Sequence, residues 1–254
     1  MGGGPGSRRL KLSAVLDPTL DADIVNLDAT EVQRLCADYK AKYGDFPGND
    51  SDPSQDQLSA LSQVIAAKGA PYADFTVFGP YGLRMLRKQT FTSYILNAAT
   101  GEWSKKEQPG PPNFHAWYMN WKVFRTAMLL LGAADAERLD GYSEHIRSFL
   151  TQFGEEAWWV VSWADVRMRS EHLDRLRRAL TERPQHGFTG ANPWSATFAA
   201  AVKDFDFWTR ELVTPATLWL AQHKGGTNRT RASSDGAEGD TLPANPKSKS
   251  KRGK

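Results

Sequence analysis

Aromatic residues at helical spacing limit what this chain can fold into more than any other feature of its sequence. The nine tryptophans and twelve phenylalanines fall between Phe46 and Trp219, and each can bury on the order of 150–250 Å² of surface. The stretch FHAWYMNWKVFRTAMLLLG carries an apolar face made of Phe114, Trp117, Trp121, Phe124 or Met128, and Leu131. This spacing predicts a long buried helix, with Asn113 as its N-cap.

Two helices are expected ahead of this one. The first is capped by Asp28 or Thr30, ends at Gly44 and has an apolar face of Val32, Leu35, Cys36 and Tyr39. Cys36 is therefore expected to be a small core residue. The second begins with a capping box of Ser54 and Gln57, stops at Gly69 and has an apolar face of Leu58, Leu61, Val64 and Ile65.

A change of period between Tyr72 and Gln108 gives the only strand candidates of the chain. ADFTVFG, TFTSYILN and EWSKKEQ are rich in β-branched and aromatic residues or alternate in polarity, and NAATG is a turn-like sequence. These segments predict a small β-hairpin or a short antiparallel sheet.

Helical patterns return after the long apolar helix. Asp135 is expected to open a helix that ends at Gly154, and the segment from Glu155 to Pro184 is expected to be the longest helix of the chain. A final group begins with Asn192 as cap and Pro193 at the first helical position. It holds Trp194, Phe198, Val202, Phe205 and Trp208, and Thr214-Pro215 restarts a short helix through Trp219.

Charge separates the end of the chain from the rest. Residues 224–254 contain eight Lys or Arg and three Asp or Glu, a balance of +5, which leaves −2 for residues 1–223 out of the chain total of +3. The same segment is poor in apolar groups, so it cannot offset its ordering entropy. We expect a flexible arm over 1–27, a helical domain over 28–223 with a strand insertion near 72–108, and a disordered basic tail over 224–254. The predicted fold class is mainly α, a helical bundle with that small β element.

The expected environment is intracellular, in the cytoplasm or the nucleus. A single cysteine permits no internal disulfide, and the N-terminal sequence lacks an apolar run of signal-peptide length. No stretch of about 18 uninterrupted apolar residues exists, so no membrane partner is expected.

Six arginines lie in the stretch VVSWADVRMRSEHLDRLRRALTERP, which begins at Val160. Asp165 precedes Arg169, Glu171 precedes Arg175 and Asp174 precedes Arg178 by four residues, an order that stabilises a helix and neutralises charge. Arg167, Arg177 and Arg183 lack such partners. Three interpretations stay open: a solvated face of a structural helix, a face that binds a polyanion or a partner, and a buried ion-pair network of Asp165, Arg167 and Arg169 beside Trp163.

Catalytic motifs are missing from the sequence. FGPYGLR is not a phosphate-binding loop, no nucleophile motif is present, and the five histidines lack the spacing of a helical zinc site. No cofactor, metal or catalytic residue is therefore expected. An enzyme with an unrecognised carboxylate or arginine site is kept as a third class of function. Trp103 is the best candidate for an exposed stacking residue.

Four blocks of the sequence resemble a multicopy, retroelement-associated family of dinoflagellate proteins. They are FTVFGPYGLRMLRK, PGPPNFHAWYMNWKVFRTAMLLLG, LDGYSEHIRSFLTQFGEEAWWVVSWADVRMRSEHLDRLRR and NPWSATFAAAVKDFDFWTRELVTPATLWL, which together cover about residues 72–223. The resemblance implies a Gag-like helical region, which in the family frequently continues past a basic linker into a zinc-knuckle-like segment. The sequence stops at Lys254, within such a linker, and no catalytic residue is implied.

The hypothesis that follows is a non-enzymatic, retroelement-derived helical domain for protein association, including self-association. Its tail would bind RNA or DNA weakly and without sequence preference, by counterion release. The candidate nucleic-acid-binding residues are Lys247, Lys249, Lys251, Arg252 and Lys254, with Arg167 and Arg177 as candidates on the folded part. The alternative is a structural interaction module whose tail is only a solubilising or nuclear-import segment.

Overall fold

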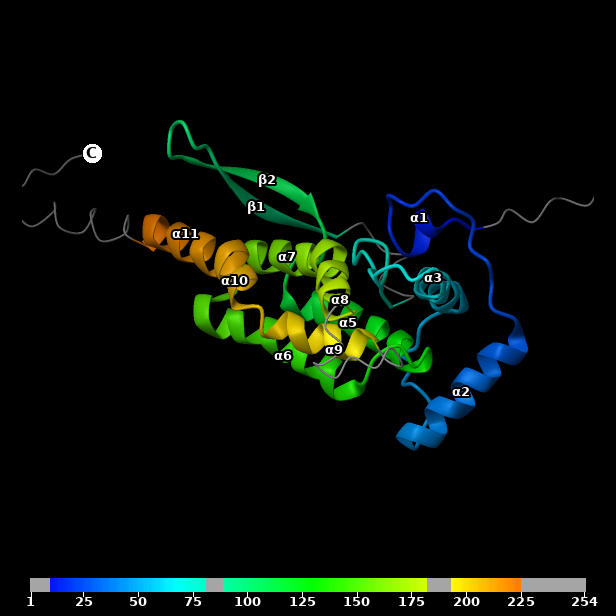
Figure 1. Cartoon of the computed structure of the whole chain (residues 1–254). Helices are drawn as coiled ribbons and strands as arrows, with labels where there is room; N and C mark the ends of the chain where they lie inside the picture. Colours follow the sequence, from blue (N-terminus) through cyan, green and yellow to red (C-terminus); the bar gives the residue numbers. More distant parts are fainter. Residues whose placement is uncertain (1–9, 81–88, 182–192, 225–254) are drawn as a thin grey trace, which may run out of the picture. The chain divides into compact units, whose positions relative to one another are not determined.

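The structure is a computed structural model that describes residues 10–80, 89–181 and 193–224. The chain divides after Thr217 into two units. The described part is mainly helical and contains one two-stranded antiparallel sheet, which confirms the predicted fold class (Figure 1). The expected arm before Leu10 and the expected tail after Lys224 lie outside the described residues.

Most of the longer helices begin and end within a few residues of the predicted positions. However, α1 lies in the expected arm, and the one long helix expected from Glu155 is divided by a 3₁₀ turn and a π-helical turn. Their bounds are α1 (Leu12–Val15), α2 (Ala29–Tyr43), α3 (Gln55–Ala66), α5 (Phe114–Leu130), α6 (Ala136–Phe153), α7 (Trp158–Arg167), α8 (Leu173–Thr181), α9 (Pro193–Val202), α10 (Phe205–Trp208) and α11 (Thr214–Lys224). A 3₁₀ turn (Glu155–Ala157) precedes α7, a π-helical turn (Met168–His172) joins α7 to α8, and a second π-helical turn (Thr209–Val213) joins α10 to α11.

Three N-caps confirm that local sequence sets where these helices start. Asp28 accepts a hydrogen bond from the backbone N–H of Glu31 at the start of α2. Ser54 and Gln57 form both bonds of a capping box ahead of α3, and Asn113 accepts from the backbone N–H of Ala116 ahead of α5. Each bond satisfies an N–H that the first helical turn leaves without a partner.

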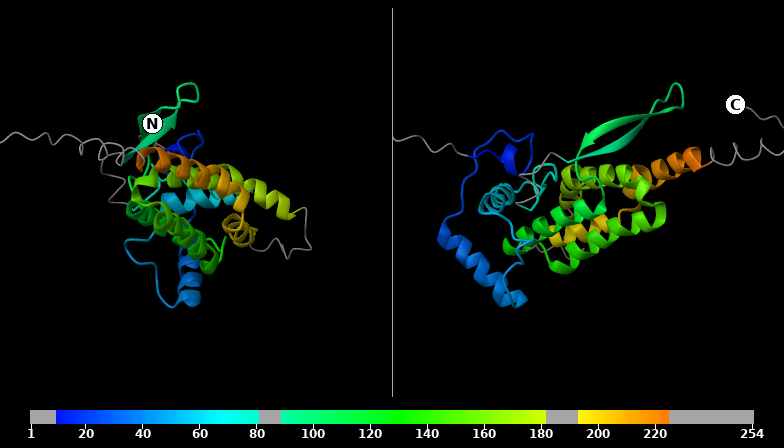
Figure 2. Two further views of the ribbon diagram at one scale, coloured as in Figure 1. Left: turned by 90° about the vertical axis from the view of Figure 1, so that its left-hand side faces the viewer. Right: turned by 180° about the vertical axis from the view of Figure 1, so that it is seen from behind.

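The hairpin consists of β1 (Thr90–Leu96) and β2 (Trp103–Pro109), which pair in antiparallel register from Thr90↔Pro109 to Leu96↔Trp103. The turn between them contains Gly101 at a φ of 72°, a conformation that glycine adopts without strain. Both views show the hairpin alongside α7 (Figures 1 and 2), and β1 is the strand that contacts this helix. The prediction of strand character for ADFTVFG, residues 73–79, is wrong. The side chain of Asp74 instead accepts a hydrogen bond from the backbone N–H of Thr76, and the segment forms a turn.

The core is an aromatic cluster centred on α5. The indole rings of Trp117 and Trp121 stack with centroids 5.2 Å apart, and Trp121 stacks in turn on Tyr142 of α6 at 5.2 Å. Phe198 of α9 meets the rings of Trp121 and Tyr142 edge to face. All four side chains are fully buried, so the middle of the predicted apolar stripe of α5 is confirmed as the centre of the bundle. The ends of the stripe, Phe114 and Leu131, are only half-buried.

Residues 10–27 differ from the expected flexible arm. Backbone hydrogen bonds join Leu12 to Ala22 and Ile24 to Leu10, and the backbone N–H groups of Val25 and Leu27 donate to side chains of α3. Leu12, Val15, Leu16 and Ile24 are buried. The two bonds to α3 span more than thirty residues of sequence, so the hydrophobic period of the sequence does not predict them.

The end of the bundle also departs from the sequence prediction. Asp204 caps α10 by accepting from the backbone N–H of Phe207, so a break separates α9 from α10. Phe205 is 74% exposed and is not part of the apolar stripe. The helix then runs through Thr209–Val213 into α11 without restarting at Thr214. Asn192, the expected cap of α9, lies outside the described residues.

Two glycines give opposite predictions for the same substitution. A methyl group at Gly79 would lie 2.3 Å from Oδ1 of Asn120, whose buried amide donates to the carbonyl of Phe75. We expect Gly79→Ala to lower the free energy of unfolding by about 1–3 kcal/mol, because Asn120 must move and lose this bond. Gly141, in α6, has nothing within 4 Å of the added methyl group. Gly141→Ala should raise stability by about 0.5–1 kcal/mol, as measured by urea unfolding; equal effects would contradict the prediction.

Candidate functional site

A pocket of about 240 Å³ lies between the base of the hairpin and the end of α7. One wall is formed by Phe91 of β1 and the segment Pro109–Pro111, and another by residues of the helical segment 162–171. Phe75 and Trp117 complete the lining from the turn after Ala73 and from α5. The pocket therefore sits where four separate parts of the chain meet, and its lining combines aromatic rings with charged side chains.

An ion pair between Asp165 and Arg169 forms part of the lining. The carboxylate and the guanidinium are each 1% exposed, and Nη2 of Arg169 lies 2.7 Å from Oδ2 of Asp165. Nε of Arg169 also donates to the same carboxylate at 3.0 Å. The favourable order of an acid four residues before a base was visible in the sequence, and the structure places this pair inside the protein.

Two core side chains complete the bonding of Asp165. Nε1 of Trp117 donates to Oδ2 at 2.8 Å, and the hydroxyl of Tyr142 donates to Oδ1 at 3.0 Å. Burial, followed by the negative charge of Asp165, holds the pKa of Tyr142 well above its usual range, so Tyr142 stays protonated as a donor. Both carboxylate oxygens are thus occupied by donors from three helical elements.

The guanidinium of Arg169 reaches the turn on the other side of the pocket. Its Nη1 donates to the carbonyl of Ala73 at 2.7 Å, and its central carbon lies 4.1 Å from the ring centroid of Phe75 and 5.4 Å from that of Tyr72. Burial lowers the pKa of Arg169, but the charge and hydrogen bonds of Asp165 raise it by more, so the group stays charged. A cation over two aromatic rings gains a further electrostatic stabilisation.

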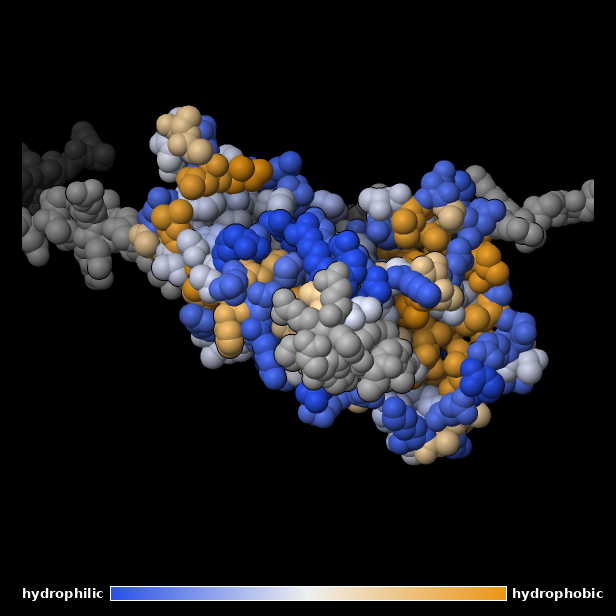
Figure 3. Space-filling view, viewed as in Figure 1, coloured by the Kyte–Doolittle hydropathy of each residue, from blue (hydrophilic) through white to orange (hydrophobic). Residues whose placement is uncertain are grey.

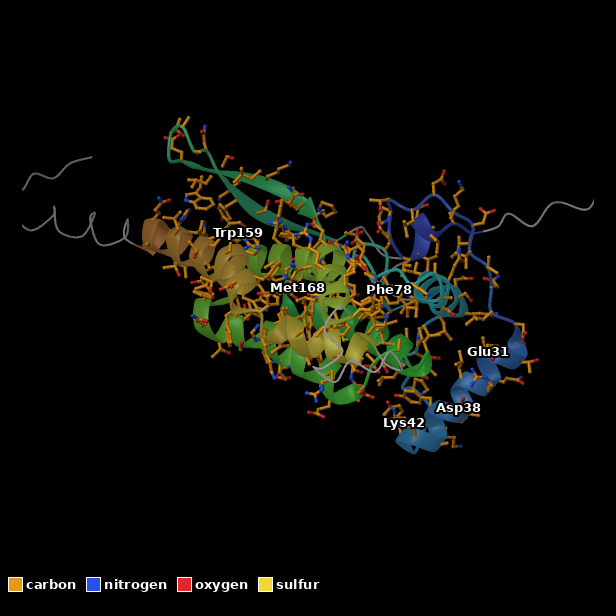
Figure 4. The ribbon with its side chains drawn as sticks, in the orientation of Figure 1. Glu31, Asp38, Lys42, Phe78, Trp159 and Met168 are labelled. Carbon is orange, nitrogen blue, oxygen red and sulfur yellow. The ribbon has the colours of Figure 1, made fainter. Side chains whose placement is uncertain are left out.

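The π-helical turn Met168–His172 supplies the segment that carries Arg169. Met168 is fully buried, and Figure 4 shows it at the junction of α7 and α8. A π-helical turn contains an extra residue and is found frequently at functional sites. Here it coincides with the charged part of the pocket lining.

The rim of the pocket is partly apolar and exposed. Trp163 is 44% exposed and Val166 is 38% exposed, although Ser162, Ala164 and Asp165 beside them on α7 are buried. The polar part of the rim is formed by Arg167, Ser170 and Glu171. Figure 3 shows apolar residues gathered along the hairpin and hydrophilic residues over α7 and α8 on the same face.

Arg167 and Arg177 are not the unpaired arginines that the sequence led us to expect. Arg167 forms an ion pair with Glu211, which lies 44 residues along the chain, and its Nη2 is also 3.9 Å from Oε2 of Glu171. Nη2 of Arg177 donates to Oδ1 of Asp174 at 2.8 Å. Both charges are therefore neutralised within the fold.

The other charge pairs of this helix follow the sequence in part. Arg178 pairs with Asp174 at 3.1 Å as expected. Arg175 has no ion-pair partner among the described residues, and Glu171, its expected partner, lies 3.9 Å from Arg167. The buried network predicted as one alternative exists for Asp165 and Arg169, whereas Arg167 stays half-exposed. Arg183 lies outside the described residues.

Trp103 is not an exposed stacking residue. Its ring packs edge to face against Trp159 of α7 at 5.8 Å, and Trp159 also meets Tyr94 of β1 at 5.7 Å. Figure 4 shows Trp159 beneath the hairpin. The aromatic residues of the strands therefore attach the hairpin to α7.

The tail candidates Lys247, Lys249, Lys251, Arg252 and Lys254 lie outside the described residues. Within the described ranges, no group of three or more His, Cys, Asp or Glu side chains could hold a metal ion. The helices of this part of the chain also include none with the length and apolar character needed to cross a membrane.

One histidine–carboxylate contact lies close to the pocket segment. Nε2 of His172 is 2.7 Å from Oδ2 of Asp204, and the imidazole stacks on the ring of Phe207 at 4.6 Å. Partial burial raises the pKa of Asp204, but the hydrogen bonds from His172 and from the backbone N–H of Phe207 lower it by more. The contact holds the π-helical turn against the start of α10, so we interpret it as a structural contact.

Comparison with known protein families, with curated proteins and with solved structures gives no match to this chain.

Removing one member of the buried ion pair should be strongly destabilising. We expect Asp165→Ala to lower the free energy of unfolding by about 3–5 kcal/mol, because it leaves the charge of Arg169 buried without its counter-ion. Asp38→Ala, which removes an exposed ion pair with Arg34 on α2, is the control and should change stability by about 0.5 kcal/mol or less.

The double variant Asp165→Leu, Arg169→Met separates charge from packing. Because neither charge remains, it should be more stable than Asp165→Ala. Guanidinium unfolding of the three variants and the parent measures all of these differences. If Asp165→Ala is no more destabilising than Asp38→Ala, the pair does not hold the site together.

Proposed function

We propose that the described helical part is a non-catalytic domain for protein association, and that the basic tail binds nucleic acid weakly and without sequence preference. The pocket beside the exposed Trp163 is the observation that carries the first half of this proposal. The partner would place a side chain in the pocket and contact the rim. A retroelement-derived, Gag-like origin is proposed on the resemblance of residues 72–223.

The rim supports association because of the residue types that it exposes. Tryptophan is enriched among the residues that contribute most to protein interfaces, typically beside a pocket from which water is excluded. Trp163 keeps 44% of its surface exposed and Val166 keeps 38%, next to a concave site with a volume of about 240 Å³. Covering these groups would remove apolar surface from water.

The described arginines support a partner other than a polyanion for the folded part. Arg167 is paired with Glu211 and Arg177 with Asp174, and Arg169 is buried against Asp165. A phosphate would have to displace these carboxylates before it gained a contact. Of the arginines that the structure describes in this helix, Arg175 alone lacks an ion-pair partner, and one such cation is a poor match for a phosphate backbone.

A non-catalytic role is supported by the bonding of Asp165. As the buried carboxylate of the pocket, it would be the first candidate for acid or base chemistry. Its two oxygens already accept from Trp117, Tyr142 and Arg169. A carboxylate whose oxygens already accept these hydrogen bonds has a structural role.

Nucleic-acid binding by the tail is supported by charge alone. Residues 224–254 carry a balance of +5, against −2 for the rest of the chain. Lysines and arginines in such a segment gain affinity by releasing counterions from phosphates. The alternative, a tail for solubility or nuclear import, uses the same residues.

Panning of random peptides displayed on phage against the immobilised full chain tests the association domain. We expect enriched peptides whose affinity falls about tenfold or more in Trp163→Ala, since loss of an interface tryptophan commonly costs about 2 kcal/mol or more. Phe205→Ala is the matched control, because Phe205 is an exposed aromatic residue that does not line the pocket. Failure to enrich any peptide, or equal losses in both variants, would contradict the proposal.

Fluorescence anisotropy of labelled single-stranded RNA and duplex DNA across a salt series tests the tail. We expect the full chain to bind with a steep salt dependence, and we expect a variant with alanine at Lys247, Lys249, Lys251, Arg252 and Lys254 to lose this binding. The double variant Arg167→Ala, Arg177→Ala is the control and should bind like the parent.

The remaining outcomes discriminate between the candidates. Binding kept by the tail variant and lost by the control variant would move the site to the folded part. Absence of binding at low salt in the parent would favour the interaction module with a solubilising or nuclear-import tail.

A further inference from the structure

We propose that the pocket receives a lysine or arginine side chain of the partner polypeptide. This inference rests on the proposed association function and names the chemical class that the pocket recognises. It is carried by three properties of the lining: its balance of charge, its aromatic walls and its size.

The charged groups of the lining favour a cation. Three carboxylates, those of Asp74, Asp165 and Glu171, line the pocket together with two guanidinium groups, those of Arg167 and Arg169. The lining alone thus carries a net charge of about −1 when every group has its usual ionisation at neutral pH. Glu211 adds a further carboxylate, which is paired with Arg167.

The two arginines of the lining already have hydrogen-bond partners within the fold, whereas the carboxylate of Glu171 at the rim can accept further hydrogen bonds. Arg169 is held by Asp165 and the carbonyl of Ala73, and Arg167 is held by Glu211. Glu171 lies 3.9 Å from Arg167, outside hydrogen-bond distance, and its side chain is 54% exposed. Its oxygens can therefore accept from an incoming ammonium or guanidinium group.

Aromatic rings on several sides suit the stem and the head of a basic side chain. Phe91 and the half-exposed Trp163 line the pocket, and a cation over such a ring is attracted by its electron-rich face. The fold already contains this arrangement, because the guanidinium of Arg169 lies 4.1 Å from the ring centroid of Phe75. The aliphatic stem of lysine or arginine packs on apolar walls while its charged head meets a polar group.

The size of the pocket matches a side chain better than a larger ligand. Its volume of about 240 Å³ is below the range of roughly 300–1,000 Å³ that is typical of small-molecule sites. An acidic occupant would meet Asp74 and Glu171, whereas the two guanidinium groups are already paired with Asp165 and Glu211, and like charges at short range oppose binding. A neutral apolar side chain would fill the space but leave Glu171 without a new partner.

A comparison of three small probes tests the inference on the full chain. The probes are the N-acetyl, N-methylamide derivatives of arginine, of citrulline, which is neutral and close to arginine in shape, and of leucine. Binding is followed by NMR through the indole N–H resonance of Trp163, which is assigned by its loss in Trp163→Phe. We expect arginine to bind at least about tenfold more tightly than citrulline or leucine, with an affinity that falls as salt is added.

Variants of the rim identify the group responsible. Glu171→Gln should reduce the preference for arginine over citrulline severalfold. Glu137→Gln, at a carboxylate whose side chain is 82% exposed on α6, should leave that preference unchanged. Equal affinities for arginine and citrulline, tighter binding of leucine, or an unchanged preference in Glu171→Gln would each overturn the inference.

The result is distinguishable from a failure of the association function. If phage peptides bind at Trp163 but lack basic residues, and the probes show no preference for arginine, the pocket binds partners of another chemical class. If neither peptides nor probes bind, both the inference and the proposed function are wrong.

Discussion

The buried ion pair between Asp165 and Arg169 is the interaction on which the arrangement around the pocket depends. Removing two charges from water is unfavourable by several kcal/mol for each ion, and the loss is offset only when every remaining polar atom finds a partner. Trp117 of α5, Tyr142 of α6 and the carbonyl of Ala73 supply those partners. The pair therefore requires α5, α6, α7 and the turn before the hairpin to meet at one place.

The pocket is a consequence of the same requirement. The guanidinium of Arg169 has to reach both Asp165 and the turn at Ala73, which keeps Phe75 beside α7. The hairpin is attached separately, through the contact of Trp103 with Trp159. Space remains between these two attachments, and the exposed Trp163 lies at its edge. Firmly bonded charged groups thus line a site whose rim, at Trp163 and Val166, stays exposed.

The parts of the fold that depend on neighbours in sequence could be predicted, and those that depend on distant contacts could not. The caps at Asp28, Ser54 and Asn113 act within three residues, so they were visible in the sequence. The partner of Arg167 is Glu211, 44 residues away, and Arg169 reaches Ala73 across 96 residues. The sequence indicated that Asp165 and Arg169 could pair, but their burial and the pocket beside them depend on these long-range contacts.

The bonding of the ion pair also determines where an incoming charge can be recognised. Because Asp165 accepts from three side chains, it cannot turn towards a ligand without leaving a buried donor unsatisfied, which is unfavourable by about 1–3 kcal/mol. In the proposed mode of binding, recognition of charge therefore falls to Glu171, whose side chain is half-exposed. An ion pair at an exposed rim contributes little affinity by itself, so most of the affinity must come from the aromatic walls. In that proposal, charge decides between partners whose side chains are similar in shape.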